Sequence, residues 1–253
     1  MHTIKQLFIY PIKGCKAITV DSAFAEERGL SFDRRLMLID QNNLFISQRS
    51  HPLIAQITPT LNDQNIGVEF QDKTITFNID HHTSNKITAQ LFENTVEGFE
   101  VSSAVSEWFS SMLHEKMKLI VMDDSILRIK KLSKQPQSTE VSYADGYPYL
   151  ILGTASINHL NSKLPYTIGP DRFRPNIYID TDIPHIEDTW DKVSIGEAEF
   201  QIIKPCKRCN VITINQDTSA SDKSILKYLS SYRKKGNHIE FGVNAICTKP
   251  GNV

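Results

Sequence analysis

Two cysteines three residues apart are the part of this 253-residue chain best suited to chemistry. Cys206 and Cys209 lie in the stretch KPCKRCNVITIN, residues 204–215. The basic residues beside them are Lys204, Lys207 and Arg208. Nearby cations favour the thiolate form of cysteine, and the thiolate is the form that binds transition metals. The pair could be a metal clip, a redox dithiol, or one reactive thiolate with a bystander.

The spacing of the other candidate ligands weighs against two of these readings. A structural zinc site needs four ligands, but Cys15 and Cys247 are single, lie near opposite ends of the chain, and no suitably spaced histidine pair follows. A redox dithiol belongs at a helix N-terminus, whereas the β-branched alternation of residues 210–215 predicts a strand. Two buried, inert thiols remain an open alternative, because free cysteine is among the most buried residue types.

Basic residues recur at predicted strand ends beside glycine or proline. Arg172 and Arg174 lie in GPDRFRPNIYID, where Pro175 is expected to hold Arg174 in an extended conformation. Lys13 follows the first predicted strand, and Arg34 with Arg35 begins another. Each cluster alone is more often solvated or locally paired. Together they suit an anionic, phosphate-bearing ligand, because arginine binds phosphate through two parallel hydrogen bonds.

Short strand-like runs with turn residues between them must position these side chains. They predict an antiparallel β domain over residues 1–100, a barrel or sandwich, and further strands at 117–122 and from 177 onward. Apolar periodicity predicts helices over 103–114, 154–164 and 224–232, with a cap at or near Thr154. Residues 131–148 are polar and predict a long exposed loop. The fold class is therefore mainly β with some α (α+β), in two β-rich lobes.

Composition excludes several classes of protein. The chain is 40% hydrophobic and 23% charged with a net charge of −1, so it offers no broad basic face for nucleic acid. The N-terminus lacks the apolar run of a signal peptide, and no stretch approaches the length of a membrane span. We expect a cytoplasmic protein with no membrane partner; its oligomeric state is left open.

Several motifs in order along nearly the whole chain resemble one family. IYPIKGCK, ERGLSFDRRLMLID, GPDRFRPNIYI, KPCKRCNVITIN and FGVNAI are similar to the MOSC-domain family with its N-terminal MOSC_N β-barrel partner, which includes the mitochondrial amidoxime-reducing component and its bacterial relatives. The resemblance implies a β-barrel-like MOSC_N domain over residues 1–100 and a MOSC β-barrel domain over 101–253. The family continues past the turn at residues 250–253, so a missing last barrel strand is expected.

The same resemblance implies a cofactor and a reaction. The cofactor is the molybdenum cofactor, a pterin dithiolene ending in a phosphate, whose metal takes a further ligand from a protein cysteine; pyridoxal phosphate is not expected. The implied activity is an oxidoreductase that reduces small N-hydroxylated substrates such as amidoximes, hydroxylamines and N-hydroxylated bases. A separate electron-donor protein is expected, because the chain has no iron–sulfur cysteine pattern. The alternative is a cofactor or sulfur carrier without turnover.

Matching positions carry the implied roles. Lys13, Arg34, Arg174 and Asn176 match positions that hold the pterin and its phosphate. Thr154 and Ser156 match hydroxyls at a helix start, and Asn244 matches a further cofactor contact. The chain departs from the family at Lys13-Gly14, where several relatives have Lys-Ser.

Cys209 is the expected metal ligand and catalytic residue, with Cys206 as the bystander. Pro205 is expected to leave Cys206 in an irregular approach to the strand, whereas Cys209 would begin the strand itself. A ligand on a regular element is held more precisely than one on a loop. The second cysteine of PCKRC also matches the family's ligand position.

Overall fold

The computed structural model describes residues 2–132 and 138–253, which fold into two compact units. Unit 1 comprises Met1–Ile9, Thr19–Ser31 and Gly146–Val253, and unit 2 comprises Tyr10–Ile18 and Phe32–Asp145. Each unit therefore draws on separate stretches of the chain. The division into domains at residue 100 stays a prediction. No helix among the described residues is long and apolar enough to cross a membrane.

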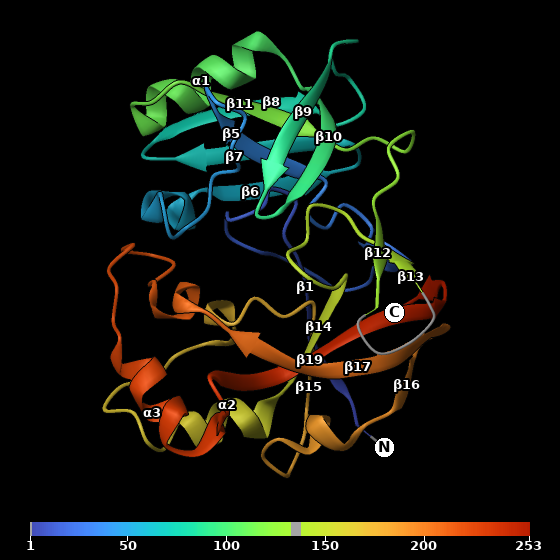
Figure 1. The fold of residues 1–253 in the computed structure, drawn as a ribbon, viewed down its shortest axis with the longest axis vertical. Coiled ribbons are helices and arrows are strands. Elements are labelled where there is room, and N and C mark those ends of the chain that lie inside the picture. Colours follow the sequence, from blue (N-terminus) through green and yellow to red (C-terminus); the bar gives the residue numbers. More distant parts are fainter. Residues whose placement is uncertain (1, 133–137) are drawn as a thin grey trace. The chain divides into compact units, whose positions relative to one another are not determined.

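Unit 1 is built on an eight-stranded sheet in the order β16-β17-β19-β14-β15-β1-β2, with β18 paired to β19 (Figure 1). Its strands are β1 (Ile4–Ile9), β2 (Ile18–Val20), β14 (Tyr149–Gly153), β15 (Ile177–Ile179), β16 (Lys192–Ile195), β17 (Ala198–Arg208), β18 (Lys234–Lys235) and β19 (His238–Lys249). The pairing of β14 with β15 is parallel. The largest fully buried side chains of this unit are Tyr149, Phe173, Phe200 and Phe241.

Short elements complete unit 1. The helices are α2 (Thr154–Asn161) and α3 (Ser224–Arg233), with single 3₁₀ turns η2 (Pro170–Arg172), η3 (Ile186–Thr189) and η4 (Asn210–Thr213). A second sheet has the order β20-β3-β4, from β3 (Phe24–Glu26), β4 (Gly29–Leu30) and β20 (Gly251–Asn252). The last residues of the chain thus pair with β3, where Gly251 lies opposite Ala25.

Unit 2 contains three smaller sheets. The first has the order β5-β11-β10-β9, the second β6-β7-β8, and the third pairs β12 with β13. Their strands are β5 (Leu36–Asp40), β6 (Thr58–Asn62), β7 (Asn65–Phe70), β8 (Lys73–Asn78), β9 (Lys86–Leu91), β10 (Asn94–Glu100), β11 (Met117–Val121), β12 (Ile129–Lys131) and β13 (Ser138–Glu140). A 3₁₀ turn, η1 (Pro52–Gln56), precedes β6.

Helix α1 (Ser103–Leu113) confirms the helix predicted by apolar periodicity. The Ser102 hydroxyl caps its first turn by accepting a hydrogen bond of 3.2 Å from Val105 N. Val105, Phe109 and Met112 form the buried face, and the helix packs against β11. Together with α2, α3 and the many strands, this confirms the predicted α+β class.

Three local predictions are wrong. Residues 210–213 form the 3₁₀ turn η4 instead of a strand. A short apolar run does not distinguish strand from buried turn, and both Ile212 and Thr213 are buried here. The run LFISQ, residues 44–48, is one of the strand-like runs that predict the β domain over residues 1–100, but it makes only isolated bridges, Ile39 to Phe45 and Leu44 to Gln90.

The exposed loop predicted over 131–148 is also wrong where the structure describes it. This stretch contains β13, and Val141, Ser142, Tyr143 and Ala144 are buried. Tyr143 belongs to a core cluster of unit 2. The polar residues near it in the sequence predicted an exposed loop, although this segment is packed. Residues 133–137 of the predicted loop lie outside the described residues.

Candidate cofactor site

The structure reverses the predicted placement of the two cysteines. Cys206 is half-buried near the end of β17, and Cys209 is exposed just after it, at the residue preceding η4. Pro205 lies within the strand, where the register of β17 against β19 shifts between Pro205 and Lys207. A bulge tolerates proline because no ladder hydrogen bond is required there. The prediction that Cys209 begins a regular strand is therefore wrong, while its role as metal ligand stays a prediction.

Arg208 contacts the half-buried cysteine, Cys206. Its Nη1 donates a hydrogen bond of 3.0 Å to Cys206 Sγ, and its Nη2 donates one of 2.6 Å to the carbonyl of Phe173. The guanidinium also lies over the Phe173 ring, 5.3 Å from its centroid. Its Nε is buried and has no hydrogen-bond partner among the described residues. Arg208 thus fixes β17 to the segment that carries Arg174 and leaves one buried donor unused.

Arg174 adopts an unexpected backbone conformation. Its φ is 56°, in the left-handed region, instead of the extended conformation predicted from Pro175. The rule for residues before proline disfavours the right-handed helical region only, so it leaves this conformation open. A hydrogen bond of 3.2 Å from Arg174 N to Pro170 O closes the turn at this point. The side chain of Arg174 belongs to unit 1, two residues beyond the buried Arg172.

The two predicted asparagines lie on the main sheet of unit 1. Asn176 is buried, accepts a hydrogen bond of 3.3 Å from Leu150 N at Oδ1, and donates one of 3.3 Å from Nδ2 to Phe8 O. It therefore joins β1, β14 and β15 through its side chain. Asn244 is half-buried in β19, where it lies opposite Leu150 on one side and Lys204 on the other.

Thr154 and Ser156 are both buried at the start of α2, and both already bind carboxylates of this chain. Thr154 Oγ1 donates to Asp180 at 2.9 Å, and Ser156 Oγ donates to Glu187 Oε1 at 2.7 Å. Glu187 Oε1 also accepts a bond of 3.2 Å from the backbone N–H of Gly153, and burial raises the pKa of this carboxyl. Gly153, not Thr154, is the N-cap. A cofactor contact at these hydroxyls stays a prediction and would require them to exchange partners.

Lys13 and Arg34 belong to unit 2, and each has an acidic partner there. The Lys13 ammonium donates to Tyr143 O at 2.9 Å and contacts Asp145, and it lies 5.6 Å and 5.8 Å from the ring centroids of Phe45 and Phe92. Burial lowers the pKa of Lys13, although Asp145 opposes the shift.

Arg34 pairs with Asp33 and lies over the Tyr10 ring at 4.5 Å. Burial opposes its charge, but Asp33 and Tyr10 together raise the pKa of Arg34. Neither carboxylate partner is predicted from the sequence. Asp145 lies 132 residues from Lys13, so no local signal joins the two; Asp33 adjoins Arg34, and that adjacency was the available signal.

Two family models match this chain. Residues 1–116 match the MOSC N-terminal beta barrel domain, and residues 138–253 match the MOSC domain. The chain is 32% identical over 244 residues to mitochondrial amidoxime reducing component 2 of Rattus norvegicus, which covers 91% of this chain and 72% of the relative. The chain belongs to the MOSC-domain family. The resemblance found in its motifs is thereby confirmed.

Other MOSC relatives carry two kinds of name. The human mitochondrial amidoxime-reducing component 1 is 28% identical over 271 residues, covering 99% of this chain and 80% of the relative. A molybdenum cofactor sulfurase from Drosophila erecta is 28% identical over 247 residues, covering 94% of this chain but 31% of the relative. The first of these names refers to amidoxime reduction, and the second refers to the molybdenum cofactor. In this chain the MOSC domain holds both Cys206 and Cys209.

Proposed function

We propose that this protein is a molybdenum-cofactor-dependent oxidoreductase that reduces N-hydroxylated small molecules. The N–O bond of the substrate breaks, two electrons and two protons are taken up, and the products are the amine or amidine and water. The observation that carries the proposal is an exposed thiol, Cys209, in the MOSC domain of a chain 32% identical to an amidoxime reducing component.

The residues of unit 1 fit such a cofactor in two respects. An exposed thiol is the type of ligand that soft-binding transition metals take from proteins. The adjacent Arg208 has a buried Nε without a partner among the described residues, and an anionic group could supply the missing acceptor. The cofactor, when bound, supplies the oxygen-accepting redox centre, while the protein supplies binding, orientation and charge.

Each candidate residue has a role that follows from its chemistry. Cys209 would ligate the metal, and Arg208 would hold Cys206 and the Phe173 segment in place beside it. In unit 1, Arg174, Asn176 and Asn244 would bind the pterin and its phosphate, with Thr154 and Ser156 at the start of α2. In unit 2, Lys13 and Arg34 would do the same, each already oriented by a carboxylate.

A second function is favoured by the sulfurase relative. A MOSC domain can hold the cofactor, or sulfur on its cysteine, without turning over a substrate, and the match to a molybdenum cofactor sulfurase covers 94% of this chain. Both functions need the same thiol and the same phosphate-binding groups, so only turnover distinguishes them.

The test uses the whole chain, expressed in a host that makes molybdenum cofactor. Metal analysis measures bound molybdenum, and reduction of benzamidoxime to benzamidine is followed with chemically reduced methyl viologen as electron donor. The proposal expects stoichiometric molybdenum and multiple turnovers. Bound molybdenum without turnover on benzamidoxime or 6-N-hydroxylaminopurine would favour the carrier. Zinc in place of molybdenum would refute both.

A further inference from the structure

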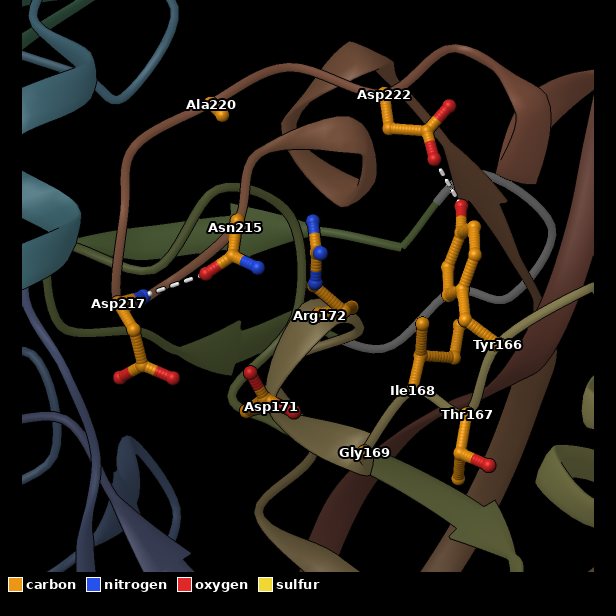
Figure 2. A pocket seen from close by; sticks show the side chains of 10 residues that line it. All are labelled: Tyr166, Thr167, Ile168, Gly169, Asp171, Arg172, Asn215, Asp217, Ala220 and Asp222. Atoms are coloured by element: carbon orange, nitrogen blue, oxygen red, sulfur yellow. Dashed lines mark hydrogen bonds between the residues drawn. The ribbon is translucent and has the colours of Figure 1, made fainter.

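A cavity of about 400 Å³ opens in unit 1 between two segments of the chain. Residues 166–172, leading into η2, form one wall, and residues 215–222, between η4 and α3, form the other (Figure 2). Its volume is in the range of small-molecule sites. The polar lining residues are Tyr166, Thr167, Asp171, Arg172, Asn215, Asp217 and Asp222.

Arg172 is the one cation among the described residues that line this cavity. Its side chain is part of a residue only 7% exposed, yet it makes a single hydrogen bond to the described residues, from Nη1 to Thr213 O at 3.0 Å. A guanidinium carries five N–H donors, and no Arg172 nitrogen is among the buried atoms that lack a partner, so its unused donors are accessible. Figure 2 shows the guanidinium between the Asn215 amide and the Tyr166 ring. Its remaining donors are therefore available to acceptor atoms of a ligand in the cavity.

The other lining groups define what kind of ligand can supply those acceptors. Asn215 Oδ1 already accepts from the backbone N–H groups of Asp217 and Thr218, at 2.8 Å and 3.1 Å, which leaves its NH₂ as a donor. Asp222 accepts from the Tyr166 hydroxyl and from Ser224 N. Asp171 is half-buried beside Arg172 and can accept a hydrogen bond.

Charge excludes a simple anion. The four ionisable lining groups besides tyrosine are three aspartates and one arginine, a formal charge of −2 at neutral pH. A free phosphate or carboxylate on Arg172 would meet this negative field. A neutral ligand that offers an acceptor to Arg172 and Asn215 and an adjacent N–H to Asp171 satisfies all three groups. The edge of a nitrogen heterocycle presents that pattern, and the Tyr166 ring with Ile168 supplies an apolar wall (Figure 2).

The cavity lies a short distance from the thiol assigned to the metal. Thr213, whose carbonyl binds Arg172, is the last residue of η4, and Cys209 immediately precedes that turn. A 3₁₀ helix rises about 2 Å per residue, so the two residues are separated by roughly 8 Å along its axis. The thiol and the residue that binds Arg172 therefore lie at the two ends of one short turn.

We propose that this cavity selects among N-hydroxylated substrates by holding the edge of a nitrogen heterocycle, with Arg172 and Asn215 as donors and Asp171 as acceptor. The inference rests on the proposed function and adds to it a residue-level basis for substrate preference. For a hydroxylaminopurine the exocyclic N–O bond is reduced by two electrons from the external donor and two protons, which gives adenine and water. An aryl amidoxime has no such heterocyclic edge and would leave the cavity unused.

The test compares two substrates in one variant, each with reduced methyl viologen as donor. Arg172→Met should lower kcat/KM for 6-N-hydroxylaminopurine by at least about tenfold, the worth of one charge-assisted hydrogen bond, and should leave benzamidoxime within about threefold. Asp171→Ala should also lower kcat/KM for 6-N-hydroxylaminopurine and spare benzamidoxime. It replaces Arg172→Met in the test if that variant does not fold. Asp182→Asn is the charge control, because this exposed aspartate of unit 1 does not line the cavity, and it should change neither substrate.

Adenine binding gives a readout that does not depend on turnover. Calorimetric titration of the loaded protein with adenine should show binding that Arg172→Met abolishes and Asp182→Asn retains. Equal losses for both substrates, or no adenine binding, would overturn the proposal. Loss of molybdenum from folded Arg172→Met would assign this arginine to the cofactor instead. A loaded wild-type protein that reduces neither substrate refutes the proposed function. The adenine titration then still shows whether the cavity binds a nitrogen heterocycle.

Discussion

Arg208 Nη1 donates a hydrogen bond of 3.0 Å to Cys206 Sγ, so the arginine between the two cysteines contacts the first of them. This places a positive charge against the half-buried thiol and leaves the exposed thiol of Cys209 to a ligand from outside. The contact distinguishes the two cysteines: Cys206 binds Arg208, and Cys209 is the exposed thiol that we propose as the metal ligand.

The first prediction separates these tasks by substitution. Cys209→Ser should abolish benzamidoxime reduction, because a serine hydroxyl is not ionised at neutral pH and is a poor ligand for a soft-binding metal. Cys206→Ser keeps a hydrogen-bond acceptor for Arg208 and should retain activity within a few-fold. Both are measured by molybdenum content and turnover. Activity in Cys209→Ser with none in Cys206→Ser would reverse the assignment, and activity in both would end the thiolate hypothesis.

The second prediction concerns Arg174. Arg174→Ala should lose cofactor while the fold persists, because a bidentate phosphate contact is worth about 1.5–3 kcal/mol, or roughly 10- to 100-fold in affinity. Arg174→Lys is the matched control, since it keeps the charge and shares the cost of the left-handed backbone at φ 56°. Molybdenum content is measured beside the thermal unfolding midpoint. Full molybdenum in folded Arg174→Ala would show that this side chain does not hold the cofactor.

The third prediction is that electrons come from a separate protein. Iron–sulfur clusters are held by groups of cysteine thiolates. Of the four cysteines in this chain, Cys15 and Cys247 are buried, and neither belongs to the pair at 206 and 209. Loaded protein should therefore turn over with reduced methyl viologen and stay inactive with NADH alone. Sustained reduction of benzamidoxime by NADH and the pure protein would contradict this prediction.

The sequence predicted the regular elements well because their signals are local. The stripe of Val105, Phe109 and Met112 specified α1, and its serine cap is adjacent in sequence. The candidate site was less predictable, because its pairings are long-range. Lys13 meets Asp145 from 132 residues away, and the Arg172 contact to Thr213 spans 41 residues.

Residues 210–215 show a different limit. Their β-branched alternation predicts a strand, but residues 210–213 form a 3₁₀ turn that also buries the side chains of Ile212 and Thr213. Thr213 Oγ1 also donates a hydrogen bond of 2.8 Å to Asn210 O, which stabilises that turn locally. The residue pattern fits both a strand and a buried turn, and tertiary packing determines which of the two conformations this segment adopts.

The fourth prediction uses His185, which packs against the rings of His159, Tyr232 and Phe241. Both ring nitrogens are buried without partners among the described residues, and burial first, then Arg233, lowers the pKa of His185 from 6.5 to about 4. Between these values the unfolded chain binds a proton that the folded chain does not. Stability from this group is therefore present above pH 6.5 and is lost as the pH falls toward 4.

The measurement is the free energy of unfolding by urea at pH 7, 6, 5 and 4.5. His185→Asn should flatten the decline below pH 6.5, because asparagine does not titrate and tolerates the left-handed backbone at φ 63°. His238→Asn, an exposed histidine, is the matched control and should follow the wild-type curve. Parallel curves for wild type and His185→Asn would contradict the prediction.

The last prediction concerns Gly14, which follows Lys13 in the turn after β1. Its φ is 90°, and a Cβ added there would lie 2.5 Å from Ile54 Cδ1. Gly14→Ala should lower the free energy of unfolding by about 1–2 kcal/mol from the backbone conformation, with a further cost from the contact. Gly236→Ala is the control, because its φ is 58° but nothing lies within 4 Å, so it should show the backbone cost alone.

Ile54→Val removes the methyl group that the new Cβ would meet. In a double-mutant cycle it should therefore cost less beside Gly14→Ala than in the wild type. Additive costs would mean that Ile54 moves aside freely and that the backbone conformation alone requires glycine at this position.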